Sequence, residues 1–418
     1  GLGDVYKRQD HNYWGAPEAQ DSRQNEMYWA NENCGDIAAE YAATLAQYAL
    51  NFPDDQDSRK YLERAKKLYA FAESNNHPYN VEDVNCEPNG GGYYRSGDCS
   101  DDLAWARAWL YLATNRDSNY NLNDTSITLN SEWNTHCWDN VGLGAAILIG
   151  EIKEDSWGTA RGWLNSYCSN SDEFFYVAKW GSNRYNCGAQ LAALVYAKHN
   201  PNESDKYKNW AKSQMDYILG AKAVNSSVPA KCYVVGFAEN SPINPHHRAA
   251  SADLSAEVKD DKYNNQYAVI GALVGGPSNK SDANNGHPAS YYEDVRSDYT
   301  ANEVSLDYNA VLVGAAAGLY SYFKTGATYE IPGVINQYPP VASTSQGDQT
   351  EGTANAVNPA VSMANAGKAV ATTVRKLYKT GVDTNIAASL SLIHISEPTR
   401  LLSISYAVFC LKKKTQKT

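Results

Sequence analysis

Apolar side chains recur at helical spacing along most of this chain. Ile37, Tyr41, Leu45 and Tyr48 fall on one face of a helix whose start Asp36 is placed to cap. The same periodicity predicts a second helix from residue 58 and further helices over residues 101–113, 142–152, 186–198, 205–219 and 302–323. Successive helix pairs of this kind predict an all-α fold, the (α/α)6 barrel of six helical hairpins.

Four segments differ in composition. Residues 10–330 carry the helical pattern and are predicted to form the folded domain, whereas residues 331–389 are rich in Ala, Thr, Asn, Gly and Ser and predict a low-complexity linker. Residues 1–9 and 390–418 read as translated sequencing-adapter DNA and are left out of the fold prediction. The apolar run near the end, at residues 404–411, is too short to span a bilayer, so no membrane partner is expected.

Charge and aromatic content narrow the class of partner. The 418 residues carry a formal net charge of −11, and residues 10–389 alone carry −16 because both terminal segments are basic. An acidic protein repels the phosphate backbone, so nucleic acid is not an expected partner. The 31 Tyr and 10 Trp residues suit ring stacking combined with hydrogen bonding. The cysteines are widely scattered without a C-x-x-C pair, which favours scattered disulfides or buried thiols over a zinc site.

One carboxylate, that of Glu303, lies in an unusual setting. The surrounding segment, YYEDVRSDYTANEVSLDYNA at residues 291–310, is dense in Asp, Tyr and Asn, and apolar residues at helical spacing follow. We expect Glu303 at the head of the predicted helix 302–323, where a side chain can be aimed rigidly at a substrate. This setting suits a general acid. An acidic first turn that only favours the helix dipole is the alternative.

A second motif, CYVVGFAENSPINPHHRAA at residues 232–250, joins an apolar strand-like run to a loop that presents His246, His247 and Arg248. Together the two motifs resemble glycoside hydrolase family 9, in which a Pro-His-x-Arg loop and an Asp-x-Arg-x-Asp-Tyr-x-x-Asn-Glu segment line the sugar cleft. The positions that match the second segment are Asp294, Arg296, Asp298, Tyr299, Asn302 and Glu303. Two motifs in the right order are more specific than either alone.

The resemblance extends from residue 10 to about residue 328 and implies a function. The expected activity is the inverting hydrolysis of β-1,4-glucosidic bonds in cellulose or related β-glucans, with Glu303 as the general acid. The substrate-binding residues that the resemblance implies are His11, Trp133, Trp180, Arg184, His246, Arg248 and Tyr308, with a weaker match at Trp14. Core packing is the alternative for each tryptophan. A metal role for His246 and His247 is disfavoured because adjacent side chains on an extended loop diverge.

The resemblance also implies a calcium site, and no organic cofactor. The segment RSGDCSDDLAW resembles the family's Ser-Gly-x-x-Asp-Glu segment, which supplies hard oxygen ligands together with a later Asp. The implied ligands are Ser96, Gly97, Asp101, Asp102 and Asp139. The loop is one residue longer than in the family and carries Asp102 in place of Glu. Asp101 as a plain helix cap is the alternative for that residue.

The sequence departs from the family in one respect that concerns the reaction. The family's two catalytic aspartates lie in an Asp-Ala-Gly-Asp segment upstream of the region that matches Asp10, and this sequence contains no such segment. We therefore expect the fragment to lack its base and the first helices of its barrel, and to be inactive by itself. An exo-acting β-glycosidase and a non-catalytic glucan-binding protein are the alternative functions. The resemblance further implies a secreted, monomeric parent protein.

Overall fold

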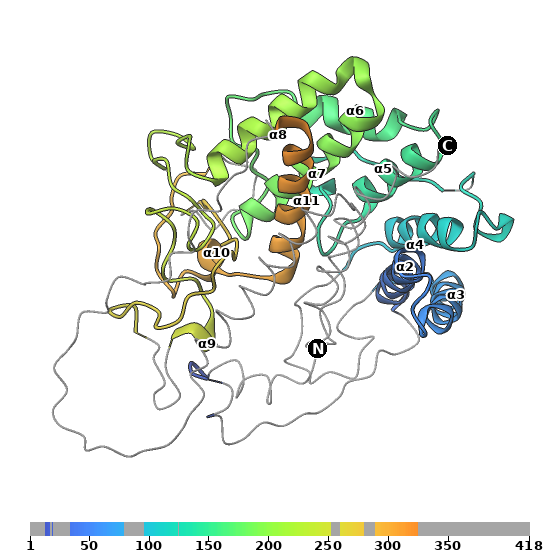
Figure 1. Cartoon of the computed structure of the whole chain (residues 1–418), viewed down its shortest axis with the longest axis horizontal. Helices are drawn as coiled ribbons and strands as arrows, with labels where there is room; N and C mark the ends of the chain where they lie inside the picture. Colours follow the sequence, from blue (N-terminus) through green and yellow to red (C-terminus); the bar gives the residue numbers. More distant parts are fainter. Residues whose placement is uncertain are drawn as a thin grey trace.

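The computed structural model describes residues 13–16, 19, 34–78, 96–123, 125–251, 260–279 and 289–324. Helices dominate this part of the chain, and β-structure is confined to isolated bridges (Figure 1). The α-helices are α2 (Gly35–Asn51), α3 (Ser58–Ser74), α4 (Ser100–Ala113), α5 (Gly142–Ile152), α6 (Gly158–Tyr167), α7 (Ser182–His199), α8 (Ser204–Ile218), α9 (Arg248–Ser251), α10 (Tyr299–Asn302) and α11 (Leu306–Phe323). Short 3₁₀ helices are η3 (Ser118–Tyr120), η4 (Glu132–Asn134) and η5 (Pro201–Glu203).

An inner layer of helices carries the core. Helices α5 and α7 are buried along almost their whole length, and one hydrophobic cluster takes residues from α2, α4, α5, α7 and α11. These helices pack in sequence order, α2 on α4, α4 on α5, α5 on α7 and α7 on α11. A helix that is apolar all round must be covered on every side, which explains why α5 lies inside.

An outer layer covers the inner one. Helices α3, α6 and α8 bury only one face each, and they pack on α2, α5 and α7 respectively. Three hairpins each join an inner helix to the outer helix that follows it, α2 to α3, α5 to α6 and α7 to α8, whereas α4 and α5 are two inner helices in succession. Such hairpins are the units that the helical pattern predicts for an (α/α)6 barrel.

The inner helices begin at one common end of the layer. The backbone N–H of Val141, at the start of α5, donates to Asp101 Oδ2 in the first turn of α4 at 2.8 Å. Arg184 in the first turn of α7 forms an ion pair of 3.2 Å with Asp307 in the first turn of α11. The loops that precede these helices consequently meet, although tens of residues separate them in the sequence.

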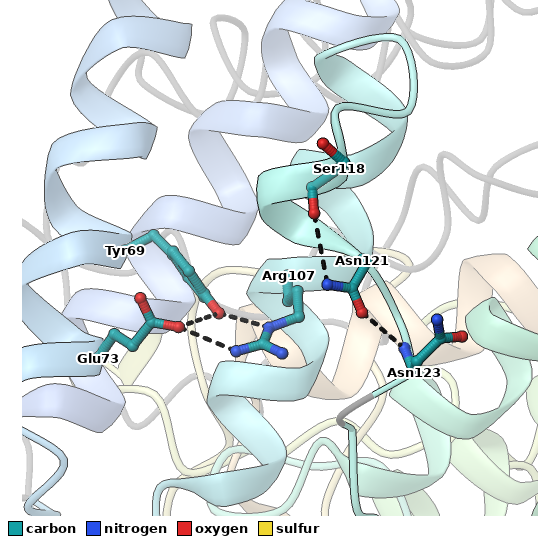
Figure 2. A network of polar contacts seen from close by, with 6 residues as sticks. All are labelled: Tyr69, Glu73, Arg107, Ser118, Asn121 and Asn123. Carbon is teal, nitrogen blue, oxygen red and sulfur yellow. Dashed lines mark hydrogen bonds and ion pairs between the residues drawn. The ribbon is translucent and has the colours of Figure 1, made fainter.

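A polar network fixes α3 against α4 (Figure 2). Arg107 on α4 donates to the hydroxyl of Tyr69 at 2.6 Å and to Glu73 Oε1 at 2.9 Å, and the same hydroxyl donates to Glu73 at 3.1 Å. Burial raises the pKa of Tyr69 to about 12, so its hydroxyl keeps its proton. Farther along the loop after α4, Asn123 accepts a hydrogen bond from Lys153 at 3.0 Å and so ties the loop to the end of α5.

The predicted helices are confirmed with three corrections. Cys34, and not Asp36, occupies the N-cap of α2, and Asp36 is buried inside the helix. The pattern at residues 157–167 contains α6, which the sequence prediction omitted. The predicted helix 302–323 is interrupted, because α10 ends at Asn302 and α11 starts at Leu306. Cys99, Cys137, Cys168, Cys187 and Cys232 are free thiols.

Candidate active site

Glu303 lies between two helices and not at the head of one, which corrects the sequence prediction. It is the C-cap of α10, with φ −59° and ψ 144°, and its backbone N–H donates to Tyr299 O at 3.1 Å. The extended backbone turns the side chain out of the helical path before α11 begins three residues later. Asp298 caps α10 by accepting the N–H of Ala301 at 3.3 Å, so the short helix holds a defined orientation.

The His loop lies directly beside this turn. His246 and Glu303 form a parallel β-bridge, in which the backbone N–H of His246 donates to Asn302 O at 2.7 Å. The Nδ1 of His246 lies 2.7 Å from Arg296 O. Because a carbonyl can only accept, Nδ1 carries the proton and Nε2 of the neutral ring is an acceptor. Fifty residues or more separate His246 from these partners in the sequence, and the structure brings them together.

Two side chains donate hydrogen bonds to the same oxygen of Glu303. Trp180 Nε1 lies 2.7 Å from Glu303 Oε2, and the hydroxyl of Tyr308 lies 3.3 Å from it. Tyr308 is buried beneath the site, whereas the side chain of Trp180 is 40 % exposed. Gly181 allows this approach, since its φ of +73° and a Cβ only 2.7 Å from the Tyr308 hydroxyl would both oppose a side chain.

Aromatic and basic groups continue the surface on one side of Glu303. The ring of Tyr299 lies 4.9 Å from that of Trp180 and 5.9 Å from that of His246. Trp14 stands edge-on to His246 at 4.9 Å, and the Arg248 guanidinium lies 5.1 Å from the Trp14 ring. Burial first, and then the Arg248 charge, lowers the pKa of His246, which keeps the ring neutral. Neutral acceptors and exposed rings suit an uncharged polar ligand such as a sugar.

On the other side of Glu303, Arg184 is enclosed. Its guanidinium pairs with Asp307 and lies 4.6 Å and 5.0 Å from the ring centres of Tyr185 and Tyr308. Burial alone would lower the pKa of Arg184, but Asp307 and the tyrosines raise it overall. Tyr185 also touches Trp133, whose side chain is 40 % exposed, at a ring distance of 6.2 Å.

The sequence-predicted residues thus fall into three groups. The first group surrounds the carboxyl group of Glu303 and consists of Glu303, Trp180, His246, Arg248 and Tyr308. Trp133 lies farther along the same chain of contacts. Arg184 is buried beneath the site. His11 lies outside the described residues. Tyr185 and Tyr299 were missed, although Tyr299 stands inside the quoted motif. The exposure of its side chain, 47 %, is what marks it as part of the surface.

A second cluster gathers buried acids at the start of α2, α4 and α5. Burial, followed by repulsion from its neighbours, raises the pKa of Asp102 and of Glu40, and the two groups share a hydrogen bond. Burial also raises the pKa of Asp139, and it raises that of Asp101 to about 6. The N-cap of α4 is Cys99 and not Asp101, whose Oδ2 accepts the N–H of Val141 at the start of α5.

The cluster fits a hard cation in its chemistry and only partly in its arrangement. Asp102 Oδ2 and Asp139 Oδ1 are buried, and neither has a hydrogen-bond partner in the described part of the chain. Ser96 is within hydrogen-bonding range of Asp139, and Gly97 lies in the exposed turn that follows. Among these described residues, however, no group of three or more His, Cys, Asp or Glu side chains is placed to hold a metal ion. The calcium site therefore stays a prediction.

Comparisons with known proteins agree with this geometry. The chain is 31 % identical over 346 residues to Endoglucanase A of Bacillus pumilus and 30 % identical over 335 residues to an Endoglucanase of Dictyostelium discoideum, covering 76 % of this chain in both cases. These alignments cover 49 % and 44 % of the relatives, so the chain spans about half the length of the curated proteins that it matches.

Solved structures carry the same fold. The catalytic domain of Clostridium thermocellum CelT superposes with a TM-score of 0.63 at 34 % identity, covering 78 % of this chain and 69 % of that one. The cellulase Cel9M of C. cellulolyticum in complex with cellobiose gives a TM-score of 0.61 at 33 % identity, covering 76 % and 72 %. These neighbours are (α/α)6 barrels, so the predicted fold class is confirmed.

The match to a family model extends over both motifs and nearly all of the described helices. The model for Glycosyl hydrolase family 9 matches residues 2–316, which include the His loop, the turn at Glu303 and the helices that position them. The resemblance inferred from the two motifs is confirmed, and the chain belongs to glycosyl hydrolase family 9.

Proposed function

We propose that this chain is part of a glycoside hydrolase that cleaves β-1,4-glucosidic bonds with inversion, and that Glu303 is its general acid. The observation that carries the proposal is the contact set of Glu303, where Trp180 and Tyr308 hold one carboxyl oxygen while His246 and Arg248 face the group. A general acid must be held rigidly and must lie open to the leaving oxygen. Glu303 meets both conditions.

The sugar-binding role falls to the groups around the acid. His246 Nε2 accepts from a sugar hydroxyl, and Arg248 donates to one. Trp133 and Trp180 supply exposed ring faces on which pyranose rings stack. Solved relatives hold cellobiose and cellotetraose, which supports a β-glucan or its oligosaccharides as the ligand of this chain.

The general base is an aspartate of an Asp-Ala-Gly-Asp segment, which this sequence does not contain. An inverting reaction needs that carboxylate roughly 6.5–9.5 Å from the acid to activate a water on the opposite face of the sugar. The chain as given then binds oligosaccharide without turning it over. Because a polymeric glucan cannot enter a cell, we place the parent enzyme outside it. No helix in the described ranges is long and apolar enough to cross a bilayer.

The test is an extended protein that carries an upstream Asp-Ala-Gly-Asp segment from a relative. It should hydrolyse carboxymethyl cellulose, and Glu303→Gln should reduce the rate by about 10²- to 10⁴-fold while oligosaccharide binding persists. Glu293→Gln is the matched control, because this carboxylate is exposed in the same loop and accepts its hydrogen bond from Tyr291. Full activity in the Glu303→Gln protein would refute the assignment.

We also propose that calcium binds the acidic cluster, with Ser96, Gly97, Asp101, Asp102 and Asp139 as its ligands. Calcium takes oxygen ligands from carboxylates and backbone carbonyls, and it neutralises the repulsion that the buried acids exert on each other. Calorimetric titration of the metal-free chain with Ca²⁺ tests the site, with Asp102→Asn as the variant that should weaken binding. Equal binding by both proteins would exclude Asp102 as a ligand.

A further inference from the structure

The indole of Trp180 is placed to act on the acid itself. Its N–H donates to Glu303 Oε2 at 2.7 Å across 123 residues of sequence. The residue stands in the turn that leads into α7, where Gly181 at φ +73° is the N-cap. The Tyr299 ring lies 4.9 Å from the indole ring, so the tryptophan is fixed from two sides.

Both donors approach one oxygen and leave the other free. Trp180 and Tyr308 donate to Oε2, and within the described ranges no hydrogen bond reaches Glu303 Oε1. An indole N–H can donate but cannot accept. A carbonyl oxygen is a stronger acceptor than a hydroxyl oxygen, so the two donors at Oε2 favour the form of protonated Glu303 that has Oε2 as its carbonyl oxygen and its proton on Oε1.

We propose that Trp180 is a positioning residue for the reaction, which directs the proton of Glu303 to Oε1 and holds that oxygen toward the substrate. The inference rests on the proposed function, in which Glu303 donates a proton to the leaving oxygen. It gives Trp180 a task beyond ring stacking, since a phenylalanine could stack on a sugar but could not hold Oε2.

Other charged or titratable groups also face Glu303, and the experiments must distinguish their effects from that of Trp180. Arg248 and His246 approach from the His loop, and Tyr308 approaches from α11. The Nδ1 of His246 donates to Arg296 O, and the Tyr308 hydroxyl donates to Oε2. Their charges act on the carboxyl group as a whole, whereas Trp180 distinguishes its two oxygens.

The first experiment needs no turnover. The full chain is labelled with ¹⁵N at its indole nitrogens, and the Trp180 cross-peak is assigned by its loss in Trp180→Phe. We expect this peak to move with pH as Glu303 gains a proton, and to lose that movement in Glu303→Gln. The same pH response in the Glu303→Gln chain, or none in the unaltered chain, would overturn the proposal.

The second experiment separates positioning from stacking in the extended protein. Trp180→Phe should lower kcat about tenfold and shift the alkaline limb of the kcat/KM profile to higher pH, because the indole stabilises the carboxylate more than the acid. Trp133→Phe is the matched control, since Trp133 is equally exposed at 40 % and should raise KM without moving that limb. If the alkaline limb of the profile does not move in Trp180→Phe, the proposal that Trp180 is a positioning residue is wrong.

The two proposals can fail separately. If Glu303→Gln leaves the extended protein active while the Trp180 peak still follows Glu303, the acid assignment is wrong and the contact is real. If Glu303→Gln abolishes activity and Trp180→Phe changes only KM, Glu303 is the acid and Trp180 only stacks on sugar.

Discussion

Arg184 and Asp307 join the first turns of two inner helices by an ion pair of 3.2 Å, with side chains 8 % and 16 % exposed. The pair lies under Tyr308, whose ring the guanidinium also contacts at 5.0 Å. Tyr308 in turn donates to Glu303. The geometry of the acid therefore depends on a buried charge pair that does not touch it.

Breaking this pair should destabilise the fold. Asp307→Ala leaves a buried guanidinium unpaired and should lower the free energy of unfolding by about 3–5 kcal/mol. Urea unfolding measures this loss of stability. Asp216→Ala, which breaks the exposed pair with Lys212, should cost less than about 1 kcal/mol. Equal effects of the two substitutions would show that burial does not govern the pair.

A side chain at Gly181 should disturb the acid site. Gly181→Ala incurs about 1–2 kcal/mol for the left-handed backbone and also places a Cβ 2.7 Å from the Tyr308 hydroxyl. Gly271→Ala is the matched control, because its φ is +83° but no atom lies within 4 Å of the added Cβ. Thermal unfolding should show the larger loss for Gly181→Ala. A larger loss at Gly271 would contradict the contact with Tyr308.

The acidic cluster should make the metal-free chain less stable as pH rises. Burial is the main cause that raises the folded-state pKa values of Asp101, Asp102, Asp139 and Glu40. The contribution of these groups to the free energy of unfolding is therefore fully present below their unfolded pKa values, which lie near 4. It is lost as pH rises through the folded values, about 6 for Asp101. Measuring the free energy of unfolding in the presence of a chelator between pH 4 and 7.5 tests whether stability falls as pH rises.

Calcium should reverse this loss near neutral pH. At about a hundredfold excess over its dissociation constant, the ion should add roughly 2.7 kcal/mol to the free energy of unfolding. Asp102→Asn should stabilise the metal-free chain at pH 7 and reduce the response to calcium. Identical melting curves with calcium and with chelator would exclude the site.

Oligosaccharide binding should weaken in acid through His246. Its folded pKa is lowered from the ordinary 6.5, first by burial and then by Arg248, so the neutral ring persists above pH 6.5 and is lost as pH falls through the lowered value. Protonation turns Nε2 from an acceptor into a donor. Calorimetry with cellotetraose in the Glu303→Gln background isolates this effect from the titration of Glu303. A variant His246→Gln should bind independently of pH in this range.

The sequence by itself determined the helices and the chemistry of the site. Periodic apolar positions predicted α2, α3, α4, α5, α7, α8 and most of α11. A helix buries either one face or all of its faces, and the spacing of its apolar residues indicates which of the two it does. The two motifs identified Glu303 and His246, since these residue types at fixed spacing follow the needs of a sugar-cleaving site. Neither conclusion required knowledge of which segments touch.

Tertiary structure alone decided how those residues meet. The break at residues 303–305 was hidden, because the helical pattern continues through it while the bridge to His246 holds the backbone extended. The bond from Trp180 to Glu303 spans 123 residues and depends on the packing of α7 against α11. Local spacing carries no information about such contacts, which arise only when inner helices pack side by side and bring the loops before them to one end.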